Sequence, residues 1–103
     1  MSVVLEFLPD AVSEVEEATR YYEQRVPGLG ARFRTELKSV CATVVRQLVR
    51  QPLLWRERPG GFRRVNLPGF PFYVAYFIRG ERILVAAVGH GSRHPHYWKQ
   101  RKS

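Results

Sequence analysis

The chain has 103 residues, of which 45% are hydrophobic and 25% are charged. This length predicts one compact domain over residues 1–103 with a modest core, and the composition excludes a disordered protein. No apolar run approaches the roughly 20 residues that a membrane-spanning helix needs, so no membrane partner is expected.

Positive charge is concentrated after residue 23. Lys and Arg residues number 17 against nine Asp and Glu residues, which gives a net charge of +8. Residues 1–23 hold six of the acids and one base, which leaves 3 acids and 16 bases for residues 24–103. A surface with that excess attracts polyanions, either nucleic acid or a strongly acidic protein. The alternative is a basic protein whose charge serves only solubility.

The N-terminal segment predicts a strand and not a signal peptide. Residues 3–8 read VVLEFL, with no basic leader before them and with Glu6 interrupting the apolar run. The single cysteine, Cys41, lies among apolar residues of helical period. It therefore predicts a buried thiol in a cytoplasmic protein.

The next part of the chain predicts two helices. Asp10 is placed to cap the first helix, which runs to about Arg25 and ends at VPGLG (26–30). The second helix begins near Ala31 and ends before Pro52. Helices joined by so short a Gly-rich turn form an antiparallel hairpin. The predicted buried positions are Ala11, Val15, Ala18, Tyr22, Phe33, Leu37, Val40, Cys41, Val44, Val45 and Leu48, and the polar face of the first helix carries Glu14, Glu17 and Arg20.

The remaining chain predicts three consecutive strands. FRRVNL (62–67) is followed by Pro68-Gly69, in the order that a type II turn prefers. FYVAYFI (72–78) and RILVAAVG (82–89) are apolar on both faces, as central strands are. The order β-α-α-β-β-β predicts an α+β domain in which the helical hairpin packs on a mainly antiparallel sheet.

Strand alternation separates two neighbouring arginines. Arg63 falls on the same face as Val65, whereas Arg64 falls on the face of Phe62 and Asn66. Arg64 lies on the more polar face, so it is the better candidate for a functional site.

The basic tail GHGSRHPHYWKQRKS (89–103) contains all three histidines of the chain. Cleavage of RNA without a metal needs a proton acceptor, a proton donor and cations that stabilise the charge growing on the phosphate. Histidine suits proton transfer because its ordinary pKa is near neutrality. The candidate proton-transfer groups are His90, His94, His96 and Tyr97, and the candidate cations are Arg64, Arg82 and Arg93.

These residues also have structural interpretations. His90, at the end of a buried strand, could be bonded to a backbone carbonyl, and Tyr97 and Trp98 could simply pack the tail on the sheet. The spacing of His90 and His94 would suit zinc in a helix, but Pro95 disfavours a helix there. No cysteine or carboxylate is close in sequence to complete such a site, so we expect no metal and no cofactor.

Three stretches together resemble the RelE/ParE superfamily of bacterial toxins. They are YYEQRVPGLGARFRTEL (21–37), FRRVNLPGFPFYVAYFI (62–78) and AVGHGSRHPHYW (87–98). The resemblance implies the toxin of a type II toxin–antitoxin module, silenced by an acidic antitoxin that wraps around it. In one branch of the superfamily the toxin cleaves messenger RNA in the translating ribosome, and in another it poisons DNA gyrase without hydrolysis. A member that only binds, without toxicity, is the alternative.

The resemblance to the ribonuclease branch is partial. Arg64 matches the first of two basic residues on a strand, but Asn66 stands where the second would be, and Tyr73 replaces an arginine of the next strand. Arg93 matches a basic residue that follows the last strand, and Tyr97 matches the tail tyrosine.

The gyrase-directed branch also lacks the arginine of the middle strand, and it often has a histidine at the end of the last strand, where His90 stands. The resemblance therefore implies a site made of Arg64, His90, Arg93 and Tyr97. The target, ribosome-bound messenger RNA or DNA gyrase, stays open, and so does the question whether the protein is an endoribonuclease.

Overall fold

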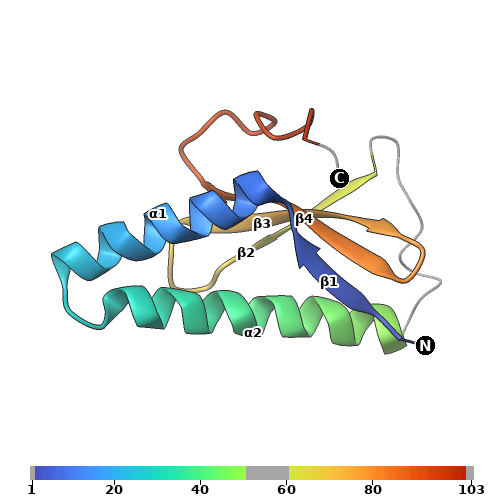
Figure 1. The fold of residues 1–103 in the computed structure, drawn as a ribbon, viewed down its shortest axis with the longest axis horizontal. Helices are drawn as coiled ribbons and strands as arrows, with labels where there is room; N and C mark the ends of the chain where they lie inside the picture. The colour runs from blue at the N-terminus through green and yellow to red at the C-terminus, as the bar shows by residue number, and fades with distance from the viewer. Residues whose placement is uncertain (1, 51–60, 102–103) are drawn as a thin grey trace.

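The computed structural model describes residues 2–50 and 61–101 of the chain, and its elements follow the predicted order (Figure 1). The elements are β1 (Val4–Phe7), α1 (Pro9–Arg25), α2 (Leu29–Arg50), β2 (Phe62–Asn66), β3 (Phe72–Arg79) and β4 (Arg82–His90). The predicted α+β class is confirmed, with two helices packed on a mixed four-stranded sheet. None of the described helices is long and apolar enough to cross a lipid bilayer.

The sheet has the order β1-β4-β3-β2, so the two strands that are apolar on both faces are its middle strands. β1 runs parallel to β4, whereas the β4–β3 and β3–β2 pairs are antiparallel. Every residue from 73 to 78 and from 83 to 89 is buried. Burial on both faces explains why these segments do not alternate between apolar and polar residues.

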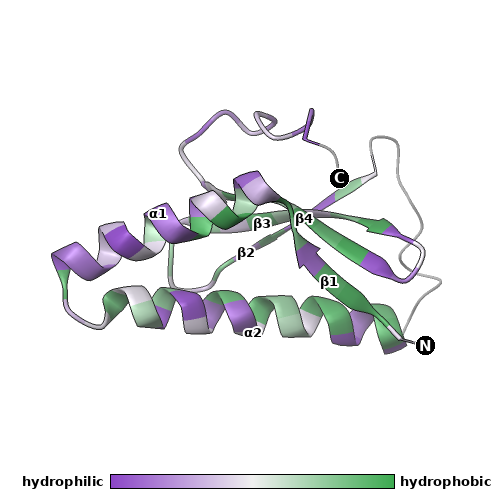
Figure 2. Cartoon of the chain, viewed as in Figure 1, coloured by the Kyte–Doolittle hydropathy of each residue, from purple (hydrophilic) through white to green (hydrophobic). Residues whose placement is uncertain are grey.

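The two faces of the sheet are covered by different parts of the chain. The antiparallel helices α1 and α2 lie side by side on one face, and the tail after β4 folds back over the other (Figure 1). Hydrophobic residues dominate β3 and β4 and alternate with hydrophilic ones along the helices (Figure 2). Phe33 is at the centre of the helix-side core, and Tyr73, Phe77 and Trp98 form the tail-side core.

The chain reversal between the helices is stabilised by Glu23. Its carboxylate accepts hydrogen bonds from the backbone N–H groups of Gly28 and Gly30, at 2.8 and 3.1 Å. Gly28 has a φ of +89°, a conformation that favours glycine. Because these bonds satisfy free N–H groups at its N-terminus, α2 begins at Leu29, two residues before the predicted start.

Two local predictions are wrong. Asp10 does not cap α1, because the helix begins at Pro9, whose fixed φ suits a first helical position, and Leu8 occupies the cap position. Asp10 lies instead in the first turn, where its negative charge interacts favourably with the positive end of the helix dipole. Gly69 does not have the positive φ of a type II turn. Its backbone N–H donates to Glu36 Oε1 at 2.7 Å, and this bond to α2 determines the path of the loop.

The predicted burial of Cys41 is confirmed, since only 8% of the residue is exposed. Burial raises the pKa of the Cys41 thiol from 9.0 to about 11. The folded protein therefore keeps the thiol proton at a pH where the unfolded chain has lost it. This contribution to the free energy of unfolding is complete below pH 9.0 and is lost as the pH rises towards about 11.

We predict that the wild type loses about 2 to 3 kcal/mol more of its free energy of unfolding than Cys41→Ala over that pH interval. Urea unfolding of both proteins at a series of alkaline pH values measures the difference. Parallel pH profiles would contradict the prediction.

Candidate functional site

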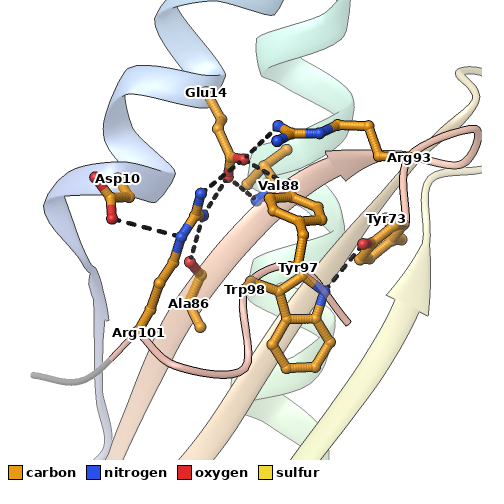
Figure 3. A network of polar contacts seen from close by, with 9 residues as sticks. All are labelled: Asp10, Glu14, Tyr73, Ala86, Val88, Arg93, Tyr97, Trp98 and Arg101. Carbon is orange, nitrogen blue, oxygen red and sulfur yellow. Dashed lines mark hydrogen bonds and ion pairs between the residues drawn. The ribbon is translucent and has the colours of Figure 1, made fainter. Parts of the chain in front are cut away.

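Glu14, on α1, is the centre of a polar network that joins α1, β4 and the tail (Figure 3). Its Oε1 accepts the backbone N–H of Val88 at 3.0 Å, and its Oε2 accepts the hydroxyl of Tyr97 at 2.5 Å. The Glu14 side chain is only 12% exposed. A carboxylate this well buried requires cationic partners, because its desolvation costs several kcal/mol.

Arg101 is the main cationic partner of Glu14. Its guanidinium donates to Glu14 Oε1 at 2.9 Å and to the carbonyl of Ala86 at 3.0 Å, and its Nε lies 3.5 Å from Asp10. The strand pairing explains why these groups meet. β1 pairs with β4 only as far as Val85, and a bulge leaves Ala86 without a partner on β3. The side chains of Glu14 and Arg101 therefore satisfy backbone groups on a strand edge that has no neighbouring strand.

Arg93 and Tyr97 form the outer part of the network. The Arg93 guanidinium carbon lies 3.8 Å from the centre of the Tyr97 ring, and Arg93 also reaches Glu14 at 3.4 Å. Its side chain is 54% exposed, so this ion pair contributes about 1 kcal/mol or less. Burial raises the pKa of the Tyr97 hydroxyl well above its ordinary value, and the hydrogen bond to Glu14 raises it further. The deprotonated form of Tyr97 is therefore rarer at neutral pH than that of an ordinary tyrosine.

Arg64 lies on a second aromatic residue, Tyr73. Its guanidinium carbon is 3.8 Å from the centre of the Tyr73 ring, and the Tyr73 hydroxyl accepts the indole N–H of Trp98 at 2.9 Å. The predicted alternation is confirmed, because Arg64 lies on the tail side of the sheet. Gly89 brings the two tyrosines close to β4, since a Cβ there would lie 2.7 Å from the Tyr97 hydroxyl oxygen and 2.9 Å from that of Tyr73.

His90, at the end of β4, packs its ring against Phe72 with 5.2 Å between ring centres. Its Nδ1 accepts the backbone N–H of Ser92 at 3.1 Å, so this ring nitrogen is an acceptor within the turn that follows β4. His90 and Arg93 line a groove of about 720 Å³ beside α1.

The predicted site residues are thus distributed over three contacts. Arg93 and Tyr97 both contact the Glu14 carboxylate. Arg64 stacks on the Tyr73 ring, and His90 packs against Phe72. The sequence analysis did not include four further residues of these contacts in the site: Glu14, Tyr73, Trp98 and Arg101. Glu14 is more than 70 positions from its tail partners, so no local pattern could have paired them. Within residues 2–50 and 61–101, no group of three or more His, Cys, Asp or Glu side chains is placed to hold a metal ion.

The fold defines the chain as a small basic α+β protein with a helical hairpin on one face of its sheet and a tail on the other. A solved structure described as a chromosomal ParDE TA system from P. aeruginosa shares this fold, with a TM-score of 0.64 and 16% sequence identity over 85% of this chain and 95% of that chain. No curated protein matches the sequence closely enough to count as a relative.

The family model described as the ParE toxin of the type II toxin–antitoxin system, parDE, matches residues 5–95. The chain therefore belongs to the ParE toxin family. This makes it a type II toxin, and the family implies an antitoxin as its partner.

We predict that Glu14→Gln lowers the free energy of unfolding by about 2 to 4 kcal/mol, because it leaves Arg101 in a half-buried position without its main counter-ion. Glu17→Gln is the matched control, since Glu17 is exposed on the same helix and should change stability by about 0.5 kcal/mol or less. Urea unfolding gives both values. Equal effects of the two substitutions would show that the network does not stabilise the fold.

Proposed function

We propose that this toxin acts in the cytoplasm and stops growth by binding DNA gyrase, without hydrolysing a substrate, until an acidic antitoxin neutralises it. The observation that carries the proposal is the bond between the Tyr97 hydroxyl and the buried Glu14 carboxylate. A tyrosine held in this way, with a raised pKa, is a poor acceptor for the proton of an RNA 2′-hydroxyl.

The distribution of cations also supports a role without hydrolysis. Cleavage would need several cations around one phosphate. Asn66 and Tyr73 stand where the ribonuclease branch has basic residues, and Arg93 shares the Glu14 carboxylate with Arg101. Arg93 and Tyr97 are then better suited to docking against a partner surface, since arginine and tyrosine are enriched among the residues that contribute most binding energy at protein interfaces.

Ribosome-dependent cleavage of messenger RNA is the second candidate function. The observation that favours it is that Arg64 and His96 line one cleft between β2 and the tail. A histidine beside an arginine offers proton transfer and charge stabilisation at one place. In that case His96, and not Tyr97, would be the proton-transfer group.

The proposed antitoxin site is an apolar groove between α1, α2 and β1. It has a volume of about 530 Å³, and its apolar lining residues are Leu5, Phe7, Val12, Val15, Leu37 and Cys41. Arg34 and Lys38 line it together with a single carboxylate, Glu16, so its charge favours an acidic segment. β1 is an edge strand, which leaves a row of backbone groups that a partner strand could pair with.

Mapping of new 5′ ends on messages separates the two candidate functions. Tyr97→Phe tests in addition whether the Tyr97 hydroxyl takes part, because it keeps the ring that carries Arg93 and removes only the hydroxyl. We expect the wild type and Tyr97→Phe to arrest growth in a host without the antitoxin, and to inhibit supercoiling by purified gyrase, within about threefold of each other. Messages in a purified translating system should stay intact with both proteins.

New 5′ ends inside ribosome-bound codons would overturn the gyrase proposal, and their loss in Tyr97→Phe would return Tyr97 to a catalytic role. A folded wild type that leaves growth unchanged would indicate a member of the family that only binds.

Val12→Asp tests the antitoxin groove, since Val12 is 42% exposed at its wall. We expect this variant to arrest growth but to resist rescue by the co-expressed antitoxin, with at least about a tenfold loss of affinity, because the added carboxylate would repel an acidic segment and replace an apolar contact. Val49→Asp is the control, because Val49 is 45% exposed on α2 and does not line the groove. Equal rescue of both variants would place the antitoxin elsewhere.

A further inference from the structure

The groove of about 720 Å³ beside α1 combines an aromatic wall with balanced charges. A continuous row of rings runs along it from Tyr21 through Tyr22 and Phe72 to His90, with 5.4, 6.1 and 5.2 Å between successive ring centres. Its charged lining residues are Glu14, Glu17, Arg25 and Arg93. Two carboxylates therefore offset two guanidinium groups, so this face does not itself repel a second copy, although the whole chain carries a net charge of +8.

Three of the lining residues form an exposed row on α1. Glu17, Tyr21 and Arg25 follow one another at intervals of four residues, so they lie on one face of the helix. Tyr21 is 51% exposed, and Val26, which also lines the groove, is 53% exposed. The C-terminal end of α1 lies at one end of the long axis of the molecule, where another chain can approach it (Figure 1).

The charges at the two ends of this row have no partner of opposite sign. Glu17 makes no hydrogen bond or ion pair with any other residue in the ranges 2–50 and 61–101. Arg25 pairs with no carboxylate in these ranges, and its guanidinium carbon lies 4.3 Å from the centre of the Tyr21 ring. Glu17 and Arg25 are about 12 Å apart along the helix axis, so they cannot pair with each other.

We propose that this face of α1 binds a second copy of the chain, with a two-fold axis at Tyr21. In a two-fold symmetric dimer the same patch meets itself, so every contact between two different residues occurs twice. When two α1 helices are antiparallel and Tyr21 lies on the axis, the equal spacing places Glu17 of each copy opposite the partner's Arg25. Both unpaired charges then gain a counter-ion, and the two Tyr21 side chains become buried between the helices.

The charge order of the row favours a second copy over other partners. A nucleic acid or an acidic protein would meet the carboxylate of Glu17, and a basic protein would meet the guanidinium of Arg25. A row that reads negative, aromatic, positive is complementary to its own antiparallel copy, and complementary charges select the partner of an interface.

The dimer interface is separate from the proposed antitoxin groove. Val12 and Glu16 line that groove together with α2 and β1, on the other side of α1 from Glu17 and Tyr21. The dimer would cover Arg93, so self-association and the docking of Arg93 to a target exclude each other. Dimerisation is a property of the purified chain, so this inference and the choice of target can fail independently.

Sedimentation equilibrium of the purified full chain tests the inference, and we expect a monomer–dimer equilibrium. Glu17→Arg and Arg25→Glu should each raise the dimer Kd at least about tenfold, because two attractive pairs become repulsive. The two variants change the net charge in opposite directions. General repulsion between basic molecules therefore predicts weaker dimerisation of the first variant and stronger dimerisation of the second.

Glu16→Arg is the matched control, because it makes the same change of charge at an exposed position on the other side of the same helix. It should change the dimer Kd by no more than about twofold. Equal effects of Glu16→Arg and Glu17→Arg would overturn the proposed interface, and so would a wild type that stays monomeric up to about 1 mM.

An equimolar mixture of Glu17→Arg and Arg25→Glu tests the two-fold arrangement. The introduced arginine of one variant would face the introduced glutamate of the other, and the native Arg25 would face the native Glu17. The mixture should therefore recover at least about tenfold in dimer affinity over either variant alone. Circular dichroism confirms that both variants are folded. Two folded variants that stay monomeric when mixed would overturn the pairing of Glu17 with Arg25.

Discussion

The tertiary structure depends on how the backbone groups of β4 form hydrogen bonds beyond the end of its neighbour β1. β1 pairs with β4 only to Val85, after which the chain turns into α1. A buried backbone group left without a hydrogen bond costs about 1 to 3 kcal/mol. Glu14 accepts the N–H of Val88, and Arg101 donates to the carbonyl of Ala86. Since a carboxylate as well buried as Glu14 needs a cation, the tail must fold back far enough to place Arg101 beside it.

That constraint also determines which charged groups are available for function. The return of the tail places Trp98 in the second core and Tyr97 on Glu14, so the tyrosine becomes part of the structural network. Arg93 and Arg101 share the charge of one carboxylate, whereas Arg64 lies apart on Tyr73. Tyr73, at a position where the ribonuclease branch has an arginine, thus supports a cation in place of supplying one. The same strand edge explains both why the tail is fixed and why Arg93 and Arg101, but not Arg64, contact Glu14.

Most of the fold could be predicted because it follows from periodicity. Helical spacing identified Phe33 as buried, and residues 73–78 and 83–89 were apolar on both faces because they form the middle of the sheet. The errors occurred where a tertiary contact or a neighbouring residue outweighed a local preference. Pro9 shifted the start of α1, and the bond from Gly69 to Glu36 determined a loop for which the Pro-Gly pair suggested a type II turn.

The sequence by itself determined the order of the elements, the two-faced burial of the central strands, the face of Arg64 and the family of toxins. The element order, the burial and the face of Arg64 depend on local spacing, which the chain carries without folding, whereas the family follows from the resemblance of three stretches of sequence. Only the tertiary structure decided that Glu14 joins α1, β4 and the tail, and that Arg93 and Tyr97 are bound to it while Arg64 is not. The physical reason is that desolvation and charge pairing act between residues that only folding brings together. A glutamate on the polar face of a helix gives no sign of the strand edge that it will meet.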